Sequence, residues 1–289
     1  MADTITQVGV VGSGLMGSGI AEVAARAGLE VVVVEASKEL AARGHKKLEG
    51  SLATAVRRQK LSEDEASKAL AYVRFTTDYA ELAESRLVVE AVTEDEQVKL
   101  ECFRTLDKVV RADDALLASN TSSIPIMKLA TATSRPEQVL GLHFFNPVPV
   151  MRLVELVTSL MTSDDVVGQA TGFVTGVLGK RVIRSQDRAG FVVNALLIPY
   201  LLSAVRMFES GFATREDIDA GMVEGCAHPM GPLALSDLIG LDTMQAVAES
   251  LYEEFKEPLY AAPPLLSRMV EAGLLGRKTG RGFYEYVAR

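Results

Sequence analysis

Short apolar segments alternate with longer amphipathic segments over the first two thirds of the chain. The apolar segments are rich in Val, Leu and Ile and have the length of strands, whereas the segments between them have the length of helices. This alternation predicts an α/β fold, a doubly wound parallel sheet with helices on both faces. The predicted strands are residues 7–11, 31–35, 86–92, 115–119, 139–145, 153–157 and 181–183.

A long polar stretch, residues 38–71, separates the second and third predicted strands. Its composition is helical, and Ser62 and Glu65 have the spacing of a capping box at the start of a second helix. We therefore expect a helical hairpin that is inserted into the sheet domain.

The strand pattern ends near Gln186, and only helical segments follow. Glycine and proline residues separate these segments, which predicts an all-α second domain. We place the α/β domain at residues 1–187 and the all-α domain at 188–289. The predicted helices of the second domain are residues 190–209, 214–223, 233–255 and 264–272.

Composition narrows the classes of function. The net charge of −8 argues against a nucleic-acid partner, which would need a basic surface. The chain has two cysteines without a CxxC pair, which indicates neither a disulfide framework nor a metal site. The start of the chain does not resemble a signal peptide. Both observations predict a cytoplasmic protein. The most apolar segment, residues 191–202, is too short to span a membrane and predicts a buried helix.

A glycine motif follows the first predicted strand and opens a helix over residues 15–27. The motif reads Gly12-Ser13-Gly14-Leu15-Met16-Gly17. In this context the three glycines allow a tight turn, a close approach of the backbone to a pyrophosphate and close packing of helix on strand. Glu35 ends the second strand about 20 positions after Gly12, where an acid binds the ribose hydroxyls. A carboxylate there would repel a 2′-phosphate, which predicts NAD rather than NADP.

Of the three histidines, His143 is the candidate for catalysis. It lies near the end of an apolar strand, where ligands bind to sheets of this kind, whereas His45 and His228 lie in settings that suit structural roles. A histidine on an apolar strand is by itself more often a core residue. Glu155, however, interrupts the next apolar run, and a buried carboxylate needs a partner. A carboxylate that holds an imidazole suits it to act as a general base.

Five segments carry a resemblance to a known family. The chain resembles the L-3-hydroxyacyl-CoA dehydrogenases over residues 6–286, with the segments in the order and nearly the spacing of that family. The segments are VGSGLMGSGIA at 11–21, SNTSSI at 119–124, GLHFFNP at 141–147, GFVVN at 190–194 and KTGRGFY at 278–284.

The resemblance implies reversible NAD-dependent oxidation of a short-chain (S)-3-hydroxyacyl-CoA, such as (S)-3-hydroxybutyryl-CoA, to the 3-ketoacyl-CoA, without a metal. It makes His143 the general base and Glu155 its partner, with Ser122 and Asn194 as substrate contacts. It also implies a homodimer formed through the helical domain. The implied cofactor contacts are Gly12, Gly14, Leu15, Met16, Gly17, Glu35, Glu94, Lys99, Ser122, Asn146 and Lys278.

CoA carries three phosphates, and an acidic protein must meet them with local positive charge. The resemblance implies CoA contacts at Ser51 and Arg58 in the polar insert. The same insert offers further cations, each of which is equally well explained as part of a solvated helix face: Lys46, Lys47, Arg57 and Lys60.

Other interpretations remain open at this point. Ser122 is also explained by an ordinary turn, Asn194 by a bond to a neighbouring helix and Lys278 by a solvated surface charge. A dehydrogenase of the wider 6-phosphogluconate dehydrogenase superfamily would be expected to use a lysine as its base. The gulonate dehydrogenase and lambda-crystallin branch shares the histidine pattern but acts on free hydroxyacids. A non-catalytic NAD-binding or structural protein would not require Ser122, His143, Glu155 and Asn194 together.

Overall fold

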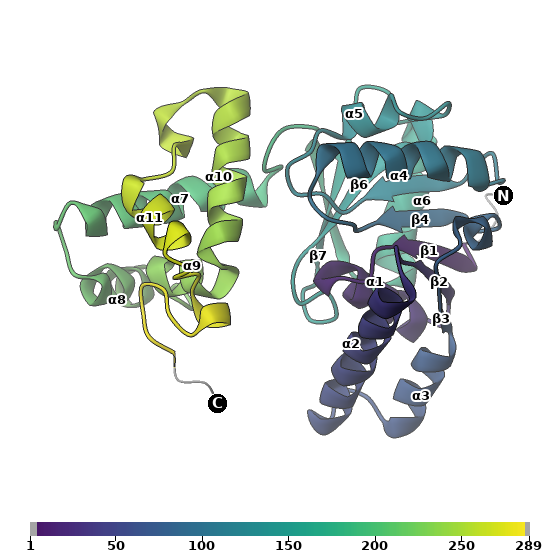
Figure 1. The fold of residues 1–289 in the computed structure, drawn as a ribbon, viewed down its shortest axis with the longest axis horizontal. Coiled ribbons are helices and arrows are strands. Elements are labelled where there is room, and N and C mark those ends of the chain that lie inside the picture. The colour runs from purple at the N-terminus through teal and green to yellow at the C-terminus, as the bar shows by residue number, and fades with distance from the viewer. Residues whose placement is uncertain (1–4, 287–289) are drawn as a thin grey trace. The chain divides into compact units, whose positions relative to one another are not determined.

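The computed structural model describes residues 5–286, and contacts within this range divide it into two compact units, the first ending at Arg188 and the second starting at Ala189. Figure 1 shows a sheet with helices in the first unit and helices in the second. Each unit has a hydrophobic core of its own. No helix within residues 5–286 is both long and apolar enough to span a bilayer.

One sheet of eight strands forms the centre of the first unit within the described residues, in the order β3-β2-β1-β4-β5-β6-β7-β8. Wholly apolar runs such as Val31 to Val34 form its inner strands because these are covered on both faces. The strands are β1 Gln7–Val11, β2 Glu30–Val34, β3 Val73–Thr76, β4 Leu87–Glu90, β5 Leu116–Ser119, β6 Val139–Phe144, β7 Leu153–Thr158 and β8 Arg181–Gln186.

The direction of the strands differs from the prediction at one edge. Strands β1 to β6 are parallel to one another, but β7 is antiparallel to β6, and β8 is parallel to β7. The predicted parallel pairing is therefore confirmed from β1 to β6 but not between β6 and β7, since the connection between these two strands is too short for a crossover helix. Strand β3 was not predicted, because it is short, lies at the sheet edge and includes the exposed Arg74 and the half-buried Thr76.

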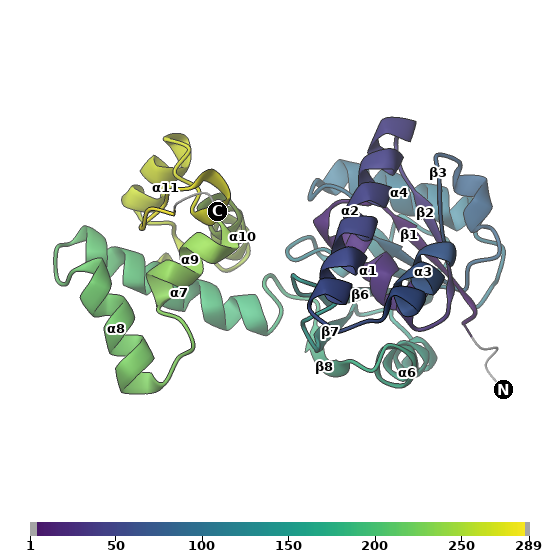
Figure 2. The same cartoon turned by 90° about the horizontal axis from the view of Figure 1, so that it is seen from below.

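Helices cover both faces of this sheet. Figures 1 and 2 together place α4 and α5 over one face and α1 and α6 over the other. This arrangement is a Rossmann-type fold and confirms the predicted doubly wound sheet. The helices are α1 Leu15–Arg26, α4 Glu96–Val109, α5 Ile126–Ala130 and α6 Asp164–Gly172, with short turns η1 Tyr79–Leu82, η2 Pro136–Gln138 and η3 Phe173–Val177.

The polar insert is a hairpin of two helices, α2 Lys38–Arg57 and α3 Glu63–Ala71, as predicted. Figure 1 shows both helices extending away from the sheet on the side of α1. The predicted capping box is confirmed: the Ser62 hydroxyl accepts from the amide of Glu65 at 3.2 Å, and the Glu65 carboxylate accepts from the amide of Ser62 at 2.8 Å. Leu48 and Leu52 of α2 are buried and fix the hairpin to the sheet domain.

The second unit consists of helices around an apolar core that includes Leu201, Val205 and Leu251. The predicted single helix over 233–255 is wrong, because Gly240 has a φ of +102° and ends one helix before the next begins. The helices are α7 Val193–Glu209, α8 Arg215–Cys226, α9 Pro232–Ile239, α10 Leu241–Phe255 and α11 Pro264–Glu271, with short turns η4 Pro258–Tyr260 and η5 Arg277–Thr279.

The apolar segment 191–202 is not wholly buried, contrary to the prediction. Ile198, Leu201 and Leu202 belong to the core of the second unit, but Leu196 on α7 is 72% exposed. Phe212, just after the end of α7, is 79% exposed. A helix facing the core on one side leaves its other apolar side uncovered when the segment is apolar all round.

Candidate active site

The glycine motif forms the turn between β1 and α1. Gly12 has a φ of +91°, and a β-carbon on it would lie 2.6 Å from the carbonyl oxygen of Ala91. A β-carbon on Gly17 would overlap the carbonyl oxygen of Gly12, so the packing of helix on strand requires this glycine. A β-carbon on Gly14, in contrast, would meet nothing within 4 Å and would fill open space. The second glycine thus keeps a space clear in front of the helix.

The start of α1 suits an anionic group in that space. Gly14 is the N-cap and supplies no side chain to the first amide groups, and no acidic residue lies in the first turn. The uncapped amides and the helix dipole both favour a phosphate at this position. Leu15 of the motif is exposed, whereas Met16 packs against the core. The predicted pyrophosphate contact therefore fits the local structure.

Glu35 lies directly after β2, as the sequence predicts for the ribose-binding acid. Its carboxylate accepts from the backbone amide of Ser13 at 2.5 Å and from the Ser13 hydroxyl at 2.8 Å. Both donors belong to the glycine motif, so the acid stands beside the turn that would hold the pyrophosphate. A carboxylate beside this turn would repel the 2′-phosphate of NADP if the adenosine ribose binds there.

His143 and Glu155 are direct neighbours across strands β6 and β7. The antiparallel register pairs the two residues, and the Nδ1 of His143 lies 2.7 Å from a carboxylate oxygen of Glu155. Glu155 is wholly buried and His143 is nearly so, with 9% of its side chain exposed. A carboxylate only accepts hydrogen bonds, so Nδ1 carries the proton and the lone pair of the neutral ring is on Nε2. The pair therefore has the arrangement of an oriented general base.

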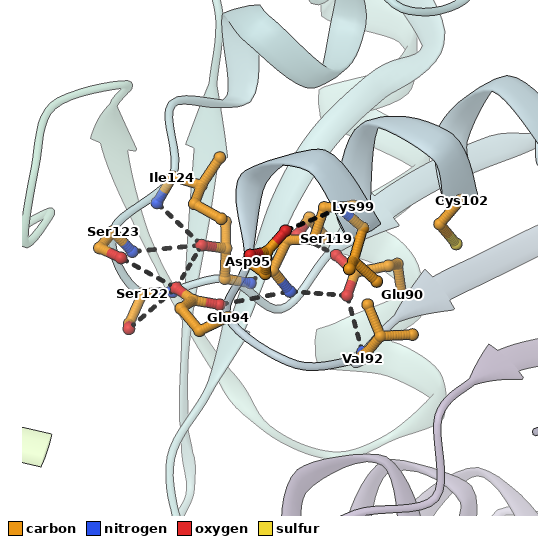
Figure 3. A network of polar contacts seen from close by, with 12 residues as sticks. Glu90, Val92, Glu94, Asp95, Lys99, Cys102, Ser119, Ser122, Ser123 and Ile124 are labelled. Carbon is orange, nitrogen blue, oxygen red and sulfur yellow. Dashed lines mark hydrogen bonds and ion pairs between the residues drawn. The ribbon is translucent and has the colours of Figure 1, made fainter. Parts of the chain in front are cut away.

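Ser122 lies in the loop that follows β5, and Glu94 binds this loop. One carboxylate oxygen of Glu94 accepts from the Thr121 hydroxyl at 2.6 Å, from the Ser122 amide at 2.9 Å and from the Ser123 hydroxyl at 3.0 Å. Figure 3 shows Ser122 and Ser123 beside Glu94. The Ser122 hydroxyl also donates to the same oxygen at 3.3 Å. The arrangement fixes both the loop and the direction of the serine proton.

Lys99 connects Glu94 to a second carboxylate that the sequence analysis did not single out. The ammonium of Lys99 lies 2.6 Å from Glu90 and 3.3 Å from Glu94 (Figure 3). Burial acts to raise the pKa of Glu94, but the Lys99 charge, the Ser122 amide and the two hydroxyl donors outweigh it and lower that pKa below its ordinary value. Glu90 ends an apolar strand, the same sequence signal that identified Glu155.

The carboxyl ends of β5 and β6 lie at one edge of the sheet, which brings the Ser122 loop and the His143 strand together. The side-chain oxygen of Asn120 accepts from the amide of Phe144 at 2.9 Å and so joins the two chain segments. Asn146, a predicted cofactor contact, is exposed just beyond β6. The edge thus gathers predicted residues from the ends of β5 and β6, as expected for the ligand-binding edge of such a sheet.

The other predicted site residues lie elsewhere. Ser51 and Arg58 are exposed on the hairpin, on α2 and at its C-cap. Asn194 is half-buried in the first turn of α7, in the second unit. Lys278, also in the second unit, forms an ion pair with Asp242, with its Nζ 2.5 and 2.6 Å from the two carboxylate oxygens.

Across residues 5–286, no group of three or more His, Cys, Asp or Glu side chains is arranged to hold a metal ion. Burial raises the pKa of Cys102 to about 12, so this thiol stays protonated and is a poor nucleophile.

Two family models cover almost the whole chain. The NAD binding domain of 3-hydroxyacyl-CoA dehydrogenase matches residues 7–188, and the C-terminal domain of 3-hydroxyacyl-CoA dehydrogenase matches residues 190–286. The chain belongs to the 3-hydroxyacyl-CoA dehydrogenase family. The family predicted from the sequence segments is thereby confirmed, and so is NAD as the cofactor.

Curated members of the 3-hydroxyacyl-CoA dehydrogenase family include close relatives. A 3-hydroxybutyryl-CoA dehydrogenase of Mycobacterium tuberculosis is 59% identical over 286 residues, which are 99% of this chain and 100% of the relative. The human mitochondrial hydroxyacyl-coenzyme A dehydrogenase is 42% identical, over 98% of this chain and 91% of the relative. The chain is therefore an NAD-dependent oxidoreductase of this family.

Solved structures of the family have the same fold. The crystal structure of M. tuberculosis FadB2 matches with a TM-score of 0.98 at 59% identity, covering 99% of this chain and 100% of that one. (S)-3-Hydroxybutyryl-CoA dehydrogenase PaaH1 from Ralstonia eutropha matches with a TM-score of 0.93 at 45% identity, over 99% and 100% of the two chains.

Proposed function

We propose that this protein catalyses the reversible oxidation of (S)-3-hydroxybutyryl-CoA to acetoacetyl-CoA. The observation that carries the proposal is the buried pair of His143 and Glu155 at the edge of a sheet that also bears the dinucleotide turn. The names of the two relatives that share 59% and 45% of the sequence support the choice of a short acyl chain.

The proposed roles of the site residues rest on the His143–Glu155 hydrogen bond and, for Ser122 and Asn194, on the family resemblance. NAD, when bound, accepts the hydride that leaves C3 of the substrate. Nε2 of His143 takes the proton of the 3-hydroxyl group, because Nδ1 already carries the proton shared with Glu155. The negative charge of Glu155 stabilises the imidazolium that forms. Ser122 contacts the substrate oxygen, and Asn194 orients the substrate from α7.

The residues that would hold the cofactor are those of the β1–α1 turn and the neighbouring strand ends. The uncapped amides of α1 would bind the pyrophosphate, and Glu35 would bind the adenosine ribose. We assign Glu94, Lys99, Asn146 and Lys278 to the residues near the bound NAD. We assign Ser51 and Arg58 of the hairpin to the CoA moiety.

A comparison of substrates tests this function. Oxidation is followed by the absorbance of NADH with (S)-3-hydroxybutyryl-CoA, a longer-chain homologue and free 3-hydroxybutyrate. We expect the short CoA thioester to have a kcat/KM at least about tenfold above that of the free acid, because the acid lacks the CoA contacts. A preference for the free acid would instead assign the chain to a gulonate-type activity.

We also propose that the protein forms a homodimer through its second unit. Leu196 and Phe212 expose large apolar surface there, and Met207 is 41% exposed on the same helix as Leu196. Exposed apolar side chains in such number on one unit are typical of an interface. Light scattering at micromolar concentration tests the proposal, which a monomeric mass would overturn.

A further inference from the structure

A buried ion pair lies beneath the loop that carries Ser122. Glu90, at the end of β4, is wholly buried, and Lys99 of α4 is 1% exposed. Figure 3 shows the two side chains meeting between the strand and the helix, and their charged atoms are 2.6 Å apart. Glu90 also accepts from the Ser119 hydroxyl at 2.6 Å and from the Val92 amide at 2.7 Å.

The stability of the fold does not account for this pair. Removing two charges from water costs several kcal/mol per ion, and apolar residues of the same volume commonly stabilise a core equally well. The remaining contact of Lys99 is the informative one, since its ammonium also lies 3.3 Å from Glu94. Lys99 thereby links a wholly buried carboxylate to the carboxylate that binds the Ser122 loop.

We propose that Glu90 is a positioning residue for the dehydrogenase reaction. Through Lys99, Glu90 holds Glu94 at the point where Glu94 accepts from the Ser122 amide and the hydroxyls of Thr121 and Ser123. The role in catalysis rests on the proposed function, in which Ser122 contacts the substrate oxygen. The coupling between Glu90 and the loop rests on the hydrogen bonds alone.

The effect of removing the Glu90 charge follows from the attraction of the Lys99 ammonium to both Glu90 and Glu94. With Glu90 neutral, Lys99 is attracted mainly by Glu94, and the Glu94 carboxylate is drawn from the loop toward the ammonium. The Ser122 amide and hydroxyl then lose part of their acceptor. A displacement of about 1 Å of a substrate-positioning group can cost on the order of 10²-fold in rate.

The first measurement is hydrogen exchange of the loop amides in the Glu90→Gln variant, without cofactor or substrate. Glutamine keeps the shape and still accepts from Lys99, but it lacks the charge. We expect the Ser122 amide to exchange at least about tenfold faster than in the wild type. The matched control is Glu96→Gln, which removes an exposed ion pair of the same 2.6 Å separation with Lys128 from the same helix. In Glu96→Gln the Ser122 amide should exchange at the same rate as in the wild type.

The second measurement is a double-mutant cycle on kcat. Glu90→Gln should lower kcat by about 10- to 100-fold in the wild type and should have almost no effect when Ser122 is already alanine, because both changes act through one group. If Glu90→Gln does not fold, Glu90→Asp, whose shorter side chain draws the carboxylate away from Lys99, takes its place in the cycle with a smaller effect.

Two results would overturn the proposal. One is a Ser122 amide exchange rate in Glu90→Gln equal to that of the wild type. The other is a Glu90→Gln decrease in kcat that is as large in the Ser122→Ala background as in the wild type. Should the wild-type protein fail to oxidise the CoA thioester, the proposed function is wrong. The exchange experiment still decides whether Glu90 holds the loop, so the two failures are distinguishable.

Discussion

Replacing Glu155 with glutamine is the most direct test of the proposed base. The wild-type carboxylate lies 2.7 Å from Nδ1 of His143 and is wholly buried, so it does not touch the substrate itself. Glutamine has nearly the same shape, and its side-chain oxygen can still accept from Nδ1. The substitution therefore removes the negative charge while leaving the orientation of the imidazole largely intact.

The expected decrease in kcat follows from the positive charge that forms on His143 when it takes the substrate proton. Two unit charges about 4 Å apart attract each other by about 4 kcal/mol at an effective dielectric constant of about 20. Since about 1.4 kcal/mol corresponds to a tenfold change in rate, losing this attraction lowers kcat by up to about 10³-fold. We expect a decrease of about 10²- to 10³-fold for Glu155→Gln, and of about 10²- to 10⁴-fold for His143→Gln, which removes the base itself.

The assay is single-turnover formation of NADH, with the affinity for NAD measured separately by fluorescence. KM for the CoA substrate should change little, because the buried carboxylate makes no substrate contact. Glu49→Gln is the matched control, since Glu49 forms an exposed pair with His45 at 3.5 Å. A folded Glu155→Gln protein with kcat within about threefold of the wild type would refute the reasoning.

Three further predictions concern the cofactor, CoA and pH. Glu35→Ser should narrow the preference for NAD over NADP, measured as the ratio of kcat/KM, because it removes the charge beside Ser13 that would repel a 2′-phosphate; an unchanged ratio contradicts this. Reversing the charges of Arg57 and Arg58 together should raise KM for the CoA substrate at low salt, and by a smaller factor at high salt, while KM for NAD changes little. A KM for the CoA substrate equal to that of the wild type at low salt would show that these arginines are only solvated surface residues. The lowered pKa of Glu94 stabilises the folded wild type relative to Glu94→Gln above the ordinary pKa of about 4.5, and this advantage is lost as the pH falls through the folded-state pKa. Urea unfolding at several pH values measures the difference in free energy of unfolding between the two proteins. A difference that does not change with pH would contradict the prediction.

The sequence predicted the parts of the site that local patterns encode. The turn at Gly12 depends on a backbone conformation that glycine favours, and the pairing of His143 with Glu155 depends on the cost of burying a lone carboxylate. Both are decided within one or two neighbouring strands. For that reason a single sequence was enough to identify them.

The sequence did not predict features that depend on contacts between distant segments. Glu90 carries the same signal as Glu155, an acid in an apolar strand, but its partner Lys99 lies on a helix whose face toward the sheet edge is not evident from spacing. The direction of β7 follows from the short connection between β6 and β7, which the apolar periodicity of the strands does not encode. The ion pair of Lys278 with Asp242 joins residues 36 positions apart in sequence.

The antiparallel pairing of β6 and β7 determines when the proton acceptor is assembled. Because His143 and Glu155 are only 12 positions apart on neighbouring strands of one hairpin, the entropy of orienting the imidazole is lost when the sheet folds rather than when a ligand arrives. The proton acceptor is thus preorganised by the first unit alone. Any reorganisation on binding is left to groups outside this pair.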